Sequence, residues 1–137
     1  MATTESLPGF FARRALIYAA QPDAAALRSQ GRTLLGRGLL EPALESFVRA
    51  GDSAGIGEVA EAARAAGDVF ACEAALKALG QAQAPAQWVV LGETALAAGM
   101  LWFAYRAFEK ADHQDGLERA RRAMFEAGIS APGSHAA

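Results

Sequence analysis

The chain has 137 residues, of which 53% are hydrophobic and 20% charged, and its formal net charge is −2. This size suits one domain, and the composition excludes an intrinsically disordered chain. The slightly acidic total gives no general attraction to nucleic acid, and the single cysteine excludes a framework of internal disulfides. We therefore expect a globular protein of a reducing compartment, the cytoplasm.

The N-terminal region contains a short apolar stretch, GFFARRALIYAAQ. Glu5 precedes it and Gln21–Pro22 ends it, so neither a secretory signal nor a membrane span is predicted. A helix over 9–20 would have hardly any polar face, so it must be covered on more than one side. It either folds onto its own protein, in the groove or as a cap on the first repeat, or pairs with another chain as a homodimer or partner contact. The apolar side chains available for such an interface are Phe10, Phe11, Ile17 and Tyr18.

The rest of the chain is predicted to be a series of helices. Alanine, leucine, glutamate and arginine favour helices, and no alternating apolar run predicts a strand. Asp23 and Ser53 are suitable N-caps, and Pro42 falls in the first turn of its helix, where its missing N–H costs little. In chain order the helices span 23–36, 40–50, 54–66, 68–79, 86–98, 100–111 and 115–127, with glycines that favour left-handed caps at Gly38, Gly67, Gly99 and Gly128.

An internal repeat becomes visible when Gly38, Gly67 and Gly99 are superposed. The residues seven before and five after each glycine are small, which lets a neighbouring helix approach closely. The residue nine after is large and fills the space between the paired helices. Because a helix pair this short cannot bury its apolar face alone, we predict that successive pairs stack on one another. The small residues are Gly31, Ala60 and Gly92, then Ala43, Cys72 and Ala104; the large ones are Phe47, Leu76 and Phe108.

These residues resemble the tetratricopeptide repeat, whose pattern is W-x2-L-G in the first helix and A-x3-F in the second. Trp88, Leu91 and Gly92, followed by Ala104 and Phe108, match it closely, and 27–50 and 56–79 match more loosely. The intervals between successive boundary glycines are shorter than the family's repeat of about 34 residues. The resemblance implies an all-α fold of helical hairpins, stacked as a short right-handed superhelix of about seven to eight helices. Its parts would be an N-terminal segment 1–22, units 23–52, 53–84 and 85–113, a capping helix 115–128 and a flexible tail 129–137.

Proteins with such repeats are generally scaffolds that bind other proteins in a concave groove lined by the first helices. The resemblance thus implies a non-catalytic adaptor or co-chaperone that binds a helix or peptide segment. Position by position, it assigns to the groove Ala25, Arg28, Arg32, Leu35, Gly57, Glu61, Arg64, Val89, Glu93, Leu96, Glu118, Arg122 and Phe125.

Other functions stay open at this point. Small acidic bacterial chaperones of secretion systems are similar in size and carry an N-terminal helix before three such repeats. A self-assembling structural subunit, with its groove filled by a copy of itself, is another alternative. An RNA-binding array would need a basic stripe in the groove, and Glu61 and Glu93 argue against it.

Two pairs of residues have both a functional and a structural interpretation. Arg28 and Arg32 lie four residues apart and therefore share one helix face. They could form a docking point for an acidic group of a partner, or a solvated face whose charge Glu61 on the next helix offsets. Trp102 and Tyr105 share a stripe that either packs on the last helix or forms an exposed aromatic contact.

Catalysis has little support in the sequence. Cys72 falls among the small packing residues, which indicates a buried, inert thiol. Asp112, His113 and Asp115 are better explained by a turn between helices than by a metal site, and His135 has no local partner. We therefore expect neither an enzyme nor a cofactor.

Overall fold

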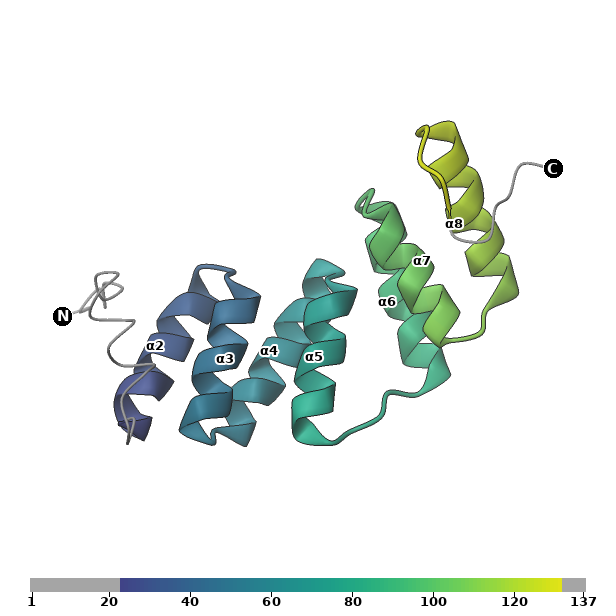
Figure 1. Ribbon diagram of the computed structural model, residues 1–137. Coiled ribbons are helices and arrows are strands. Elements are labelled where there is room, and N and C mark those ends of the chain that lie inside the picture. Colours follow the sequence, from purple (N-terminus) through teal and green to yellow (C-terminus); the bar gives the residue numbers. More distant parts are fainter. Residues whose placement is uncertain (1–22, 132–137) are drawn as a thin grey trace. The chain divides into compact units, whose positions relative to one another are not determined.

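The structure, a computed structural model, describes residues 23–131, and within this range its regular secondary structure consists of seven helices and no strand (Figure 1). The predicted all-α, helical repeat-like fold is confirmed. The right-handed sense of the superhelix stays a prediction, and the helix expected over 9–20 lies outside the described residues. The helices are α2 (Ala24–Gly36), α3 (Leu40–Ala50), α4 (Ser53–Ala66), α5 (Val69–Leu79), α6 (Pro85–Ala97), α7 (Leu101–Lys110) and α8 (Gln114–Glu126).

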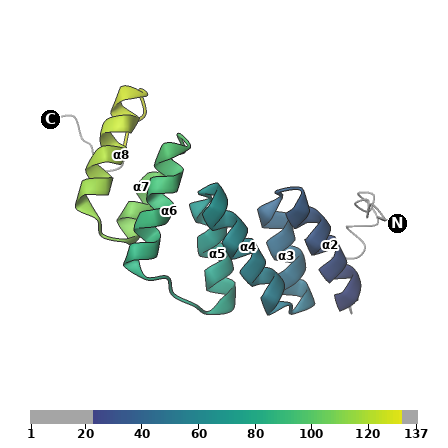
Figure 2. The same cartoon turned by 180° about the vertical axis from the view of Figure 1, so that it is seen from behind.

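The chain divides into two compact units. The first unit runs to Ala62 and includes Ala71–Gln81, so it holds α2, α3 and most of α4 and α5. The second consists of Ala63–Phe70 and the residues from Ala82 onwards, so it holds the last turn of α4, the start of α5 and all of α6, α7 and α8. Figure 1 and the opposite view in Figure 2 show α2 against α3 in the first unit and α7 against α6 and α8 in the second.

The helices end and begin close to the predicted residues because the signals are local. Gly38 and Gly99 follow α2 and α6 with φ angles of 74° and 76°, a left-handed conformation that strains other residues. Asp23 caps α2 by accepting hydrogen bonds from the backbone N–H groups of the second and third helical residues. The prediction for Ser53 is wrong: it is the first residue of α4, and Asp52 Oδ1 is the cap, accepting from the Gly55 N–H at 3.1 Å.

A phenylalanine held between two glycines forms the centre of each unit. In the first unit, a Cβ added to Gly31 of α2 would lie 2.8 Å from the Phe47 ring, and one added to Gly55 of α4 would lie closer still. In the second, Gly92 of α6 and Gly116 of α8 enclose Phe108 in the same way. The prediction that Gly31 and Gly92 allow close approach is therefore confirmed. The role of Gly55 and Gly116 was not foreseen.

The two units repeat each other at the offset that places Phe47 on Phe108. The five core residues Leu34, Ala43, Phe47, Ile56 and Val59 of the first unit are buried together. Their counterparts at this offset are buried together in the second unit: Ala95, Ala104, Phe108, Leu117 and Ala120. The structural repeat is thus a three-helix group, α2–α3–α4 and then α6–α7–α8, with α5 between the two groups in the chain.

The third helix of each group, α4 or α8, has a side-chain N-cap, but the capping residue is an aspartate in the first group and a histidine in the second. His113, the counterpart of Asp52, accepts a hydrogen bond through Nδ1 from the Gly116 N–H at 3.0 Å. Its ring also stacks on Phe108, with ring centroids 5.7 Å apart. The histidine therefore both caps α8 and covers the central ring of the second unit.

We expect His113→Ala to lower the free energy of unfolding by about 1 kcal/mol, because α8 loses its N-cap. His113→Asp should retain most of that stability, because aspartate caps the equivalent helix α4. Urea unfolding followed by circular dichroism measures both variants. A His113→Ala variant as stable as the wild type, or an Asp variant as unstable as the Ala variant, would contradict the capping role.

The last described helix has a polar outer face. At the position of buried Ala60 in α4, α8 carries the exposed Arg121, and its neighbours Glu118, Arg122 and Glu126 are also exposed. A polar outer face is typical of a capping element at the end of a repeat array, and the capping role of the helix expected over 115–128 stays a prediction. The exception is Phe125, whose side chain is 83% exposed.

Candidate binding site

The arginines predicted for the groove in the first unit are engaged in ion pairs. Arg28 Nε lies 3.6 Å from Asp52 Oδ2, and Arg32 Nη1 lies 4.0 Å from Glu58 Oε2. The acids paired with these arginines are Asp52, the N-cap of α4, and Glu58 of α4, and the contribution expected of Glu61 stays a prediction. This pairing favours the solvated face over an anion-docking point, because exposed ion pairs contribute little and attract further anions weakly.

The equivalent positions of the second unit carry the same pair with the charges exchanged. Arg119 of α8 donates through Nη1 to Glu93 Oε2 of α6 at 3.1 Å and through Nη2 to Glu93 Oε1. Its Nε donates to Asp115 Oδ2 at 3.2 Å, and its guanidinium lies over the Phe108 ring. The hydrogen bond from Arg119 holds the pKa of Glu93 below its ordinary value, helped by the charge of Arg119 and opposed by burial.

This pKa shift gives a direct test of the Glu93–Arg119 pair. A carboxylate whose pKa is lower in the folded than in the unfolded state stabilises the fold above its unfolded pKa, and this contribution is lost as the pH falls through the folded pKa. Replacing Arg119 by glutamine should raise the titration midpoint of Glu93 towards the ordinary glutamate value. Carbon NMR of the Glu93 carboxyl measures the midpoint, with Arg106→Gln as a control that removes an arginine paired with Glu109 instead. Equal midpoints in wild type and Arg119→Gln would refute the pairing.

A small apolar pocket lies within the second unit, against the first half of α6. This helix starts at Pro85, where proline suits the first helical position, and Gln87 Oε1 accepts a hydrogen bond from the Ala84 N–H at 3.2 Å. Residues spaced by one, four and five positions share one helix face, so α6 presents a short apolar strip. The cavity has a volume of about 250 Å³ and is lined by Ala86, Gln87, Val90 and Leu91 of α6 and by Arg64 of α4.

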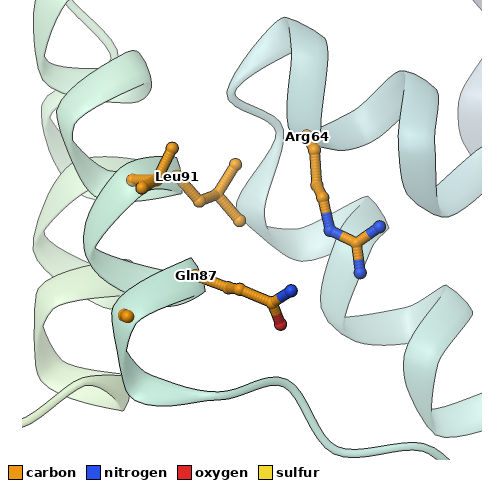
Figure 3. A pocket seen from close by; sticks show the side chains of 5 residues that line it. Arg64, Gln87 and Leu91 are labelled. Atoms are coloured by element: carbon orange, nitrogen blue, oxygen red, sulfur yellow. The ribbon is translucent and has the colours of Figure 1, made fainter.

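Polar groups hold the opposite wall of the pocket in place. Arg64 lies in the last turn of α4, and its Nε donates to Gln83 Oε1 at 2.9 Å. Figure 3 shows Gln87 and Leu91 pointing from α6 towards the helix that carries Arg64. Leu91 is buried at the base, whereas Val90 is 66% exposed. The arrangement offers an apolar surface beside one cation and suits an uncharged side chain that enters from outside.

Of the residues predicted for the groove, Arg64 is the one that lines this pocket. Leu35 packs on the core of the first unit, and Val89 and Leu96 pack on the core of the second. The remaining groove residues lie at the surface or on an open side, outside the pocket lining: Ala25, Gly57, Glu61, Glu118, Arg122 and Phe125. The pocket residues Ala86, Gln87 and Val90 were missed because they lie on the face of α6 next to the predicted one.

The aromatic pair on α7 is divided between packing and exposure. Tyr105 is 7% exposed, and the Arg121 guanidinium of α8 lies 5.6 Å from its ring centroid, so it packs on the last helix. Trp102 meets Tyr105 edge-on and is 46% exposed. The other predicted interface residues, Phe10, Phe11, Ile17 and Tyr18, lie outside the described residues.

Cys72 is a buried thiol, as the sequence predicts, and His113 serves as a helix cap. Within residues 23–131, no group of three or more histidine, cysteine or acidic side chains is placed to hold a metal ion. In the same range no helix combines the length and apolarity needed to cross a membrane.

These features define an all-helical, repeat-like protein with one small apolar pocket described in its second unit. No family model, curated protein or solved structure matches the chain. The resemblance to the tetratricopeptide repeat therefore rests on this chain's own residues and helical hairpins.

Proposed function

We propose that this chain is a non-catalytic interaction module of the cytoplasm that binds a helix or peptide segment of another protein. The observation that carries the proposal is the pocket between Arg64 and the exposed strip of α6. Ala86 and Val90 offer exposed apolar surface there to a partner, Leu91 is buried at the base, and the walls are parts of helices, which hold a binding surface in place.

The size of the pocket favours a peptide over a small molecule. Cavities that enclose drug-sized ligands measure about 300–1,000 Å³. The volume here, about 250 Å³, suits one apolar side chain of a longer segment that makes its other contacts outside the pocket. Peptide recognition commonly takes this form, with side-chain anchors in pockets along an extended contact.

Peptide display on the full-length chain tests the proposal. A random library of short peptides is panned against the wild type, and the enriched peptides are then measured by fluorescence anisotropy against Val90→Glu. We expect an enriched family of sequences with an apolar anchor and a loss of at least about tenfold in affinity on Val90→Glu, because a buried charge is costly.

Val48→Glu is the matched control, since Val48 is also a half-exposed valine, on α3 of the first unit. It should bind the selected peptides like the wild type, and thermal melts should show that both variants stay folded. If panning enriches no common sequence, or if Val90→Glu binds the peptides as well as Val48→Glu does, the proposed function is wrong.

A further inference from the structure

We propose that residues 1–22 of this chain dock, through a helix, on the side of the α2–α3 pair that lies away from α4, and that they cap the first unit there. The segment would then cover its own chain and not a second one. This docking surface belongs to the first unit, so the proposal does not rest on the pocket, which lies in the second.

In the second unit, the corresponding side of the α6–α7 pair is covered by residues that come before it in the chain, Ala63–Phe70. A Cβ added to Gly67 would lie 2.9 Å from the end of the Met100 side chain. Phe70 packs edge-on against Phe103 of α7, with ring centroids 5.1 Å apart. The cover of this helix pair is thus supplied by the preceding part of the chain, as is usual in an array of stacked repeats.

The same side of the first unit exposes an apolar residue. Helices α2, α3 and α4 begin at the counterparts of the first residues of α6, α7 and α8, at the offset that places Phe47 on Phe108, so the two units can be compared residue by residue. Leu39 is then the counterpart of Met100. The Met100 side chain is partly buried against the core of the second unit, whereas Leu39 is 44% exposed. Figures 1 and 2 show α2 at the outer edge of the first unit, where the residues before α2 join it.

A buried polar group marks the same side. Gln30, the counterpart of Leu91, is 4% exposed, and its Nε2 donates to Ser46 Oγ at 3.2 Å. Among the described residues, none donates a hydrogen bond to the buried Oε1 of Gln30. A buried carbonyl oxygen without a donor is costly, so a donor from a docked segment would stabilise the fold. The counterparts of the other pocket-lining residues of α6 are small and allow close approach: Ala25, Ala26 and Ser29.

The residues before α2 have the length and the side chains to cover this surface. At the same offset, α5 falls on residues 8–18, which overlap the helix expected over 9–20. α5 packs on the core of the first unit through Ala75, whose counterpart is Arg14, a residue suited to an outer side that faces solvent. The segment also supplies large apolar side chains for the surface of α2 and α3: Phe10, Phe11, Leu16 and Ile17.

The attachment of the segment favours its own chain over a second copy. Pro22 directly precedes Asp23, the N-cap of α2, so the segment joins the chain within one helical turn of Ala25 and Ala26. A tethered segment has a high effective concentration at a nearby site, and it occupies that site ahead of a free segment of equal affinity. Its two arginines and Tyr18 supply hydrogen-bond donors for the buried amide oxygen of α2.

Hydrogen exchange of the backbone amides in the full-length chain tests the docking, because a docked helix protects its own amide groups. We expect the amides of residues 11–18 to exchange at least about tenfold more slowly than those of an unfolded chain of the same sequence. Leu39→Glu should remove most of this protection, because it places a charge in the docking surface.

Val48→Glu is the matched control for Leu39→Glu. Val48 is exposed to a similar extent, 48%, and its counterpart in the second unit, Glu109, is itself an exposed glutamate. This variant should therefore protect residues 11–18 as the wild type does. Circular dichroism and thermal melts establish that both variants are folded. Rates in the wild type equal to those of an unfolded chain, or equal protection in Leu39→Glu and Val48→Glu, would overturn the inference.

Two further measurements identify the site and the chain that the segment occupies. Exchange at two protein concentrations should give the same protection, because the docking is within one chain; protection that rises with concentration would identify a second copy and overturn the inference. Val90→Glu should leave the protection unchanged. Protection lost in Val90→Glu but kept in Leu39→Glu would place the segment in the pocket and also overturn the inference. Each of these outcomes is separate from the Val90-dependent binding of selected peptides that tests the proposed function.

Discussion

Replacing Phe108 by alanine is expected to lower the free energy of unfolding by about 3–5 kcal/mol. The side chain is fully buried, and its ring is enclosed by Gly92, Gly116, His113 and Arg119. The two glycines have no side chains that could turn into the vacated space, so the cavity would collapse only by moving helices. Urea unfolding followed by circular dichroism measures the change.

Phe125→Ala is the matched control for this prediction. It removes the same side chain from α8, but at a position that is 83% exposed, so its effect should stay within about 0.5 kcal/mol. A Phe108→Ala variant whose free energy of unfolding lies within about 1 kcal/mol of the control's would show that the ring is not the centre of the second unit.

The second large effect is expected at Gly55, where alanine should cost about 1–3 kcal/mol through overpacking. A methyl group there would meet the Phe47 ring well inside van der Waals distance, near the ring's attachment point as well as its edge. Gly57→Ala, two residues later on α4, meets no atom within 4 Å and should stabilise the fold by up to about 1 kcal/mol through helix propensity. Thermal and urea unfolding of the two variants should shift in opposite directions.

A double variant shows whether the cost at Gly55 arises from the ring. Phe47→Leu shortens the side chain that the new methyl group meets, so Gly55→Ala should cost less in that background than in the wild type. Additive effects of the two substitutions would mean that Gly55 matters for another reason, and a stabilising Gly55→Ala would refute the close packing altogether.

The helices could be predicted from sequence because their signals lie within a few residues of each end. Glycine at 38 and 99 ends a helix through its own backbone, and Pro42 is acceptable only in a first turn. The one wrong cap, Ser53, lies next to Asp52. Both residue types favour the N-cap, and local preference alone does not choose between neighbours.

The packing of each core was predictable in part. The superposition of Gly38, Gly67 and Gly99 identified Gly31 and Gly92 because both fall in one column of small residues, with Ala60 between them. The same superposition also aligns Gly55 with Gly116, with Ala84 between them in the series, but a repeat of two helices leaves both glycines outside the unit because they lie on the third helix. The offset from Phe47 to Phe108 equals the offset from Gly38 to Gly99, so a unit that includes the third helix brings both flanking glycines into the repeat.

The pocket and the ion pairs could not be predicted, because both depend on which helix faces which. Arg64 and Gln87 lie on separate helices with all of α5 between them in the chain, and nothing in their local patterns links them. The same holds for Arg32 with Glu58 and for Glu93 with Arg119. The family resemblance assigned residues to one face of each first helix. On α6 it selected Val89, whereas the next residue, Val90, lines the pocket.

The exchange of sign between Arg32–Glu58 and Glu93–Arg119 affects how two similarly built halves find their correct neighbours. If α2 associated with α8, two cations would meet, and if α6 associated with α4, two anions would meet. Shape alone would tolerate either error, since each half offers a phenylalanine and a matching pair of glycines. Opposed charges at corresponding positions penalise such exchanges, within one chain during folding and between chains at high concentration.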